Sequence, residues 1–87
     1  MNYHWNQYLI EFLGTLFFAY TIFLTGNYLA IGAALSIAIL LGGGMYNPAI
    51  AIAKFYNGDL SSTDLVPYIV SQILGALVAV TILKNQS

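Results

Sequence analysis

Residues 42–49 hold the polar groups of this chain whose chemistry is easiest to state; they read GGGMYNPA. An Asn-Pro pair predicts a helix start, because the Asn47 side-chain oxygen can cap free backbone N–H groups and Pro48 suits the first helical position. The glycines allow an extended backbone that presents carbonyl oxygens. These groups would hydrogen-bond a passing polar solute, and no chemistry on the solute is needed.

The helix that begins at Asn47 is expected to be short, because Asn57-Gly58 ends it like a C-terminal turn. Residues 42–57 then form a re-entrant segment whose helix, of roughly 8–10 residues, is about 12–15 Å long. The hydrocarbon core of a bilayer is about 30 Å thick, so this helix crosses about half of it. Backbone groups at that depth need protein or a water-filled cavity around them. A pore is therefore favoured over the alternative, an interfacial loop between two short helices.

Composition places the chain in a membrane. Hydrophobic residues make up 60% of its 87 residues and charged residues only 6%, far below the usual quarter. Cysteine is absent, which excludes disulfides and thiolate metal sites. His4 is the only histidine, and we interpret it as an interfacial residue without a partner cluster. We predict an integral, multi-pass membrane protein that is not an enzyme and needs no metal, cofactor or nucleic acid.

Three spanning helices are expected around the re-entrant segment, at about residues 8–24, 28–41 and 63–83. Small residues recur at every fourth position of the second and third helices, which lets helices approach closely in lipid. These residues are Ala30, Ala34 and Ala38 in the second helix, and Ser71, Gly75 and Ala79 in the third. We expect both stripes to pack against neighbouring helices.

Together, parts of the chain resemble the major intrinsic protein family, the aquaporins and glycerol facilitators. Residues 43–50 resemble the first asparagine-proline-alanine loop of that family, residues 10–15 the start of its first helix, and residues 66–76 its third helix. The resemblance implies half of an aquaporin-like fold, all-α, with three transmembrane helices and one re-entrant half-helix. It implies a passive channel for water or small neutral solutes such as glycerol. The pore-lining residues would be Gly43, Gly44, Met45, Asn47, Pro48 and Ala49.

Two strongly polar residues lie inside the expected spans, Glu11 in the first and Gln72 in the third. Glu11 has three interpretations: an interfacial carboxylate that reaches water, a proton-coupling acid, or, as the resemblance implies, a buried acceptor that supports the re-entrant loop. The resemblance places Gln72 beside the same loop. A simple interhelical hydrogen bond explains Gln72 equally well.

The resemblance covers one of the two inverted halves of an aquaporin, so a second half is expected to complete the pore. The only Lys or Arg residues are Lys54 and Lys84, expected on opposite sides of the membrane. The positive charge is therefore almost equal on the two sides of the membrane, and insertion in both orientations requires such a balance. We therefore expect an antiparallel homodimer in the lipid bilayer, with a ring of such pairs as a larger assembly. The alternatives are a non-conducting accessory subunit of a full-length channel and a dual-topology proton-coupled transporter that uses Glu11.

Overall fold

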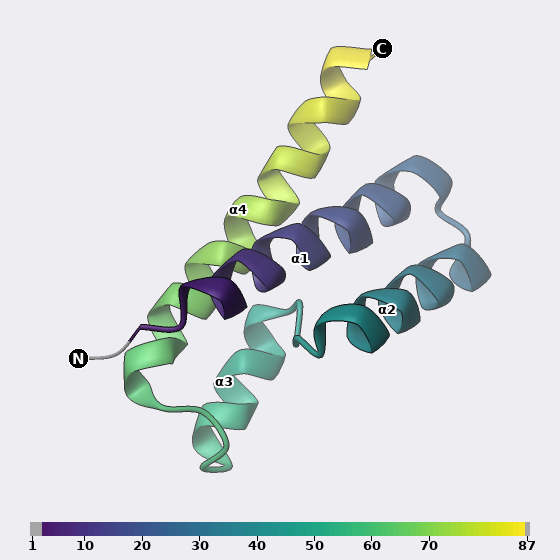
Figure 1. Ribbon diagram of the computed structural model, residues 1–87. Helices are drawn as coiled ribbons and strands as arrows, with labels where there is room; N and C mark the ends of the chain where they lie inside the picture. The colour runs from purple at the N-terminus through teal and green to yellow at the C-terminus, as the bar shows by residue number, and fades with distance from the viewer. Residues whose placement is uncertain (1–2, 87) are drawn as a thin grey trace.

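The computed structural model describes residues 3–86, and all the regular structure in that range is α-helical (Figure 1). In chain order the helices are α1 (Trp5–Thr25), α2 (Tyr28–Gly42), α3 (Pro48–Tyr56) and α4 (Ser62–Gln86). The predicted all-α class is confirmed. α1 and α4, of 21 and 25 residues, are long and apolar enough to cross a membrane, whereas α2 is apolar but has only 15 residues.

Local sequence explains where these helices begin and end. Gly26 and Gly43 follow α1 and α2 with φ of 58° and 68°, a left-handed conformation in which glycine carries no steric penalty. Asn27 and Asn47 precede α2 and α3, and each side chain accepts a first-turn backbone N–H, at 2.9 and 2.8 Å. α3 thus begins where the Asn-Pro pair predicts it.

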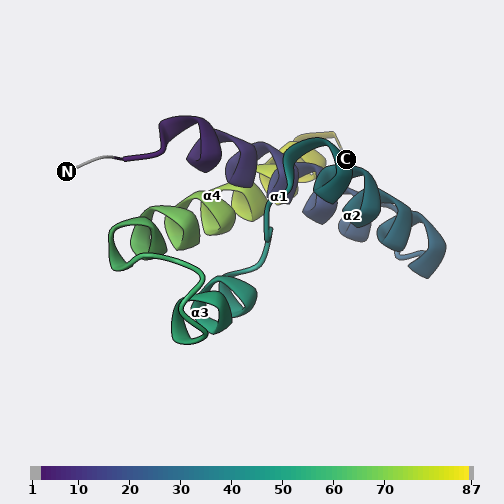
Figure 2. The ribbon, with the colours of Figure 1, turned by 60° about the horizontal axis from the view of Figure 1, so that its bottom comes forward.

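The two long helices pack against each other, and the shorter two are attached to them. α1 packs against both α4 and α2, while α3 packs against α4. Figures 1 and 2 show α3 lying beside the first half of α4, apart from the body of α2. The loop that joins α2 to α3 contacts α1 through Glu11, and this contact forms the candidate site.

Small residues allow the close contact between α1 and α4. Gly75 lies directly on the backbone of α1, because an added Cβ would stand 2.5 Å from the Phe12 carbonyl oxygen and 3.1 Å from the Leu16 amide nitrogen. Ala79, one turn later, is completely buried. Ser71, at the other end of this stripe, is half-buried, and its hydroxyl donates to the Pro67 carbonyl (2.7 Å).

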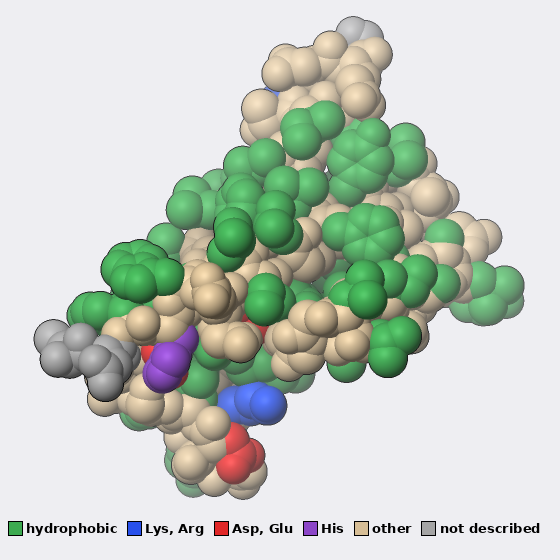
Figure 3. Space-filling view, viewed as in Figure 1, with side chains coloured by type: hydrophobic (Ala, Val, Ile, Leu, Met, Phe, Trp, Pro, Cys, Tyr) green, Lys and Arg blue, Asp and Glu red, His purple; other side chains and the backbone are tan. Residues whose placement is uncertain are grey.

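The stripe on α2 is buried in its second half. Ala34 and Ala38 are buried, and Ala30 is half-buried. The larger side chains of α2 point outward, and Leu40 and Leu41 are more than four-fifths exposed. Figure 3 shows hydrophobic side chains over the outer surface of the long helices, whereas most of the visible charged side chains lie near α3 and the start of α4. Such an apolar exterior suits contact with lipid.

Candidate functional site

The carboxylate of Glu11 lies at the centre of the candidate site. It is 1% exposed, on the face of α1 that meets the α2–α3 loop and α4. One oxygen, Oε2, accepts the backbone N–H of Met45 (2.9 Å). The other, Oε1, accepts the backbone N–H of Tyr46 (2.9 Å) and the side-chain Nε2 of Gln72 (2.9 Å). Three N–H groups from two other parts of the chain therefore converge on one buried acceptor.

The peptide groups of the loop turn their N–H groups inward. Gly44 donates to the Tyr46 hydroxyl (3.3 Å), and Met45 and Tyr46 donate to Glu11. The described residues contain no cis peptide, and a trans peptide directs its carbonyl opposite to its N–H. The carbonyl oxygens of Gly43, Gly44 and Met45 consequently point away from the groups that hold the loop. Within residues 3–86, no backbone N–H donates to any of the three.

We call the outward carbonyls of Gly43, Gly44 and Met45 the carbonyl strip. Asn47 lies at the end of this strip and adds hydrogen-bond donors to it. Its backbone is extended (φ −156°), its Oδ1 accepts the Ala49 N–H, and its side chain is exposed. With the oxygen used in capping, the amide NH₂ faces outward. Pro48 stands at the first helical position, half-buried, and Ala49 is exposed. The positive end of the α3 dipole lies at the same point, so the strip changes from acceptors to donors at Asn47.

Tyr46 also belongs to the site, although no sequence pattern singled it out. It is 3% exposed and has φ +59°, a conformation that bulky residues rarely adopt. Its ring fills a slot floored by Gly14, Gly42 and Gly44, where an added Cβ at any of the three would overlap the tyrosine. Its hydroxyl donates to the Ala38 carbonyl (2.6 Å). The available signal was that Tyr46 is the one hydroxyl-bearing residue in GGGMYNPA.

His4 was interpreted above as an interfacial residue without a partner cluster; no group of three metal-ligating side chains occurs within residues 3–86, but the structure adds one partner, the carboxylate of Asp64. The Nδ1 atom of His4 lies 3.0 and 2.9 Å from the two carboxylate oxygens of Asp64, at the start of α4. The Tyr8 hydroxyl donates to the same carboxylate (2.6 Å). Partners this far apart in sequence leave no local pattern. The cluster ties the first turn of α1 to that of α4, remote from the carbonyl strip.

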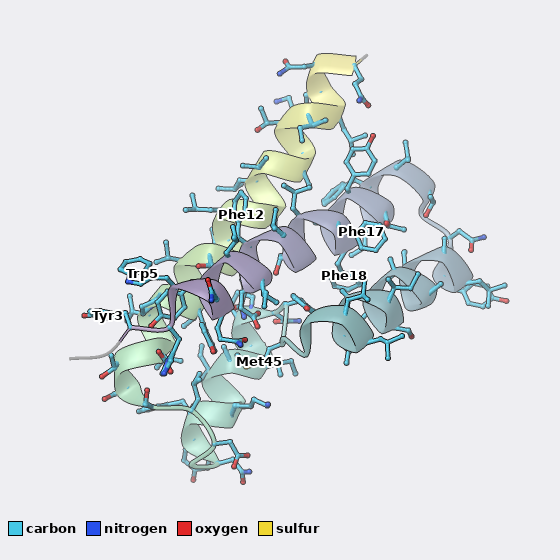
Figure 4. All side chains as sticks on the ribbon, in the orientation of Figure 1. Tyr3, Trp5, Phe12, Phe17, Phe18 and Met45 are labelled. Carbon is cyan, nitrogen blue, oxygen red and sulfur yellow. The ribbon has the colours of Figure 1, made fainter. Side chains whose placement is uncertain are left out.

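The predicted site residues thus divide into two groups. Met45, which is half-buried and labelled in Figure 4 at the junction of α2 and α3, lies with the glycines and Asn47 along the loop. Glu11 and Gln72 lie behind the loop, and Gln72 is 1% exposed with its Oε1 unpaired among the described residues. Glu11 does not reach the surface, so the interfacial interpretation of this carboxylate does not fit the structure.

Comparisons with known proteins agree on one family. The family model described as Major intrinsic protein matches residues 25–87. Glycerol uptake facilitator protein-like 6 of Lactiplantibacillus plantarum is 35% identical over an alignment 93 residues long. The alignment covers 92% of this chain and 43% of that protein. Aquaporin Z of Brucella melitensis is 44% identical over 43 residues, covering 49% of this chain and 19% of that protein.

A plant relative extends the comparison. Probable aquaporin TIP1-2 of Oryza sativa is 38% identical over 56 residues, which cover 64% of this chain and 22% of that protein. The chain therefore spans less than half the length of these curated relatives. No solved structure matches it.

Proposed function

This chain belongs to the major intrinsic protein family, and from that premise we propose that it forms half of a passive membrane channel. The solutes would be water and small neutral molecules such as glycerol. Members of the family are integral membrane proteins and not enzymes, and the lengths and apolar character of α1 and α4 agree with a membrane location.

The observation that carries this proposal is the orientation of the α2–α3 loop. Glu11 and Tyr46 take up the N–H groups of the loop, which leaves the carbonyls of Gly43, Gly44 and Met45 turned outward. A solute entering a narrow pore loses hydrogen bonds to water, and a row of fixed acceptors replaces them. No reaction is required, and the row needs only to be held still.

Asn47 would act as the donor at the end of this row. Its amide NH₂ can hydrogen-bond a water or hydroxyl oxygen, whereas the N–H groups of Ala49 and Ala51 are already bonded to Asn47. The positive end of the helix dipole would disfavour cations at the same point. The chain contains no Arg that could assist, so charge exclusion in this proposal rests on the Asn47 region.

In the proposed topology the chain has three spans and one re-entrant segment, with the bounds given above: 8–24, 28–41, 42–57 and 63–83. α3 has nine residues and a length of about 13 Å, roughly half of the hydrocarbon core. α2, with 15 residues, is about 22 Å long, and the glycine loop leads from its end into the re-entrant segment.

A second, inverted half is proposed to complete the pore, in the form of an antiparallel copy of this chain. α3 packs against α4 but keeps an exposed apolar side that includes Ile50 and Ile52. Lys54 lies in the last turn of α3 and Lys84 in the last turn of α4. With one cation expected near each surface, charge sets no strong preference for one orientation. A ring of such pairs is the larger assembly that the proposal allows.

The sequence allows two other functions. A proton-coupled transporter would need Glu11 to bind and release protons, whereas three N–H groups already occupy this carboxylate and leave it facing no open path. An accessory subunit that conducts nothing by itself would need a full-length channel as its partner. Flux through the chain alone separates this possibility from the channel.

Stopped-flow shrinkage of liposomes that contain only this chain tests the proposal, under sucrose and then glycerol gradients. Asn47→Asp keeps a good helix cap but replaces the outward donor by an anion. Asn27→Asp makes the same change at the cap of α2 and is the matched control. Fast flux that Asn47→Asp lowers at least tenfold, and Asn27→Asp preserves, supports the channel. Flux equal to that of empty liposomes from folded protein overturns the homomeric pore.

A further inference from the structure

The hydroxyl of Tyr46 bridges two backbone groups that the chain must keep in register. It donates to the Ala38 carbonyl of α2 (2.6 Å) and accepts the N–H of Gly44 (3.3 Å). The donor and acceptor functions of the hydroxyl are both used, and the residue is buried. The last part of α2 is thereby fixed to the start of the loop by one side-chain atom.

The anchors of the loop are divided between two residues. Glu11 holds the N–H groups of Met45 and Tyr46, which sets the peptides that carry the Gly44 and Met45 carbonyls. The preceding peptide, between Gly43 and Gly44, makes no hydrogen bond to Glu11, although the carboxylate lies beside Gly44. Its N–H is held only by the Tyr46 hydroxyl among the described residues.

The peptide between Gly43 and Gly44 is the least restricted of the loop peptides. Glycine on both sides means that no side chain restricts its rotation, and Gly43 already has φ +68°. A peptide with such freedom can turn its carbonyl away from the strip at small energetic cost. The tyrosine ring is itself fixed by the slot over Gly14 and Gly42, so the hydroxyl is a rigid anchor.

We propose that the Tyr46 hydroxyl is a positioning group that aims the Gly43 carbonyl into the strip and thereby favours polyols over water. This inference rests on the proposed channel function. A polyol presents several hydroxyls in a row and needs consecutive acceptors at the same time, whereas a water molecule needs one acceptor at each position. Losing the direction of one carbonyl therefore slows glycerol more than water. The loss of one hydrogen bond corresponds to about a fivefold fall in the ratio of glycerol flux to water flux.

Tyr46→Phe tests the inference, because it keeps the ring in its slot and removes only the hydroxyl. Tyr20→Phe, which removes an exposed hydroxyl near Gln86, is the matched control. Amide hydrogen exchange of the full chain in nanodiscs, followed by NMR, reads the loop directly. We expect Tyr46→Phe to speed exchange at Gly44 about fivefold and to leave the Met45 amide, held by Glu11, unchanged.

Flux in liposomes is the second measurement, with the glycerol-to-water ratio expected to fall about fivefold. Unchanged exchange at Gly44 overturns the inference, and so does equal acceleration at Gly44 and Met45, which would make the tyrosine a general support of the loop. A fall in both fluxes by the same factor overturns the effect on solute choice. Wild-type flux equal to that of empty liposomes overturns the channel instead, while exchange at Gly44 still decides whether the hydroxyl holds this peptide.

Discussion

The Nδ1 atom of His4 lies 2.9 Å from Oδ2 of Asp64, a residue 60 positions further along the chain. This contact joins the residue that precedes α1 to the first turn of α4. Asp64 is 7% exposed, and the Tyr8 hydroxyl donates a second hydrogen bond to its carboxylate. The crossing of α1 and α4 is therefore fixed at one end by polar contacts, in addition to the small residues in its middle.

Asp64→Asn is expected to destabilise the protein by about 1 kcal/mol, since it replaces charge-assisted bonds to His4 and Tyr8 by weaker ones. Unfolding in mixed detergent micelles measures the effect. Asp59→Asn, at an exposed position in the α3–α4 turn, is the control and should change stability by less than about 0.5 kcal/mol. Equal stability of the two variants would contradict a structural role for the cluster.

Glu11→Gln should release the α2–α3 loop. The amide that replaces the carboxylate carries its own N–H donors, so one of the three N–H groups now facing Glu11 loses its acceptor. Leaving a buried donor unpaired costs about 1–3 kcal/mol. Faster amide exchange at Met45 and Tyr46, together with lower water flux, is the expected result.

The same variant separates the channel from a proton-coupled transporter. A transporter that uses Glu11 would lose transport driven by a pH gradient while the Met45 and Tyr46 amides stayed protected. Exchange unchanged from wild type at both amides would show that the carboxylate does not hold the loop.

Gly75→Ala and Gly32→Ala form a matched pair that tests helix packing. An added Cβ at Gly75 would meet the backbone of α1, so we expect a loss of about 1–3 kcal/mol or a shift of α4. At Gly32 the space is open, and alanine in a helix should stabilise by about 0.5–1 kcal/mol. Thermal unfolding of both variants in one detergent gives the comparison. Loss of stability in Gly32→Ala would argue for an interface on α2.

Gly14→Ala tests the slot that holds the Tyr46 ring. The new methyl group would overlap the ring, and we expect a cost of about 1–3 kcal/mol. Combining it with Tyr46→Ala should cost less than the sum of the two single changes, because the smaller side chain makes room. Strict additivity of the unfolding free energies would show that the two residues do not share the slot.

Sequence alone predicts the parts of this structure that depend on local signals. Asn47 and Pro48 mark the start of α3, and Asn57 its end, because capping uses neighbours along the chain. The contribution of Tyr46 could not be predicted this way. Its left-handed backbone occurs together with hydrogen bonds to Glu11 and Ala38, which lie in α1 and α2. The pairing of His4 with Asp64 is hidden for the same reason.

The family resemblance also predicted a contact between residues far apart in the sequence. It placed Glu11 behind the loop, a relationship across 35 residues that periodicity does not reveal. It could not indicate which loop peptide each anchor holds, because this depends on where the side chains of Glu11 and Tyr46 lie in the folded chain. The Tyr46 hydroxyl, which accepts the Gly44 N–H, could be identified as an anchor only from the structure.

The bonds of Glu11 also set an order of events while the ribosome makes the chain. Glu11 is synthesised 34 and 35 residues before the two backbone amides that it accepts and 61 residues before Gln72. A lone carboxylate is costly within a bilayer. The carboxylate of Glu11 therefore has its full set of hydrogen-bond donors only once the nascent loop and α4 have reached α1.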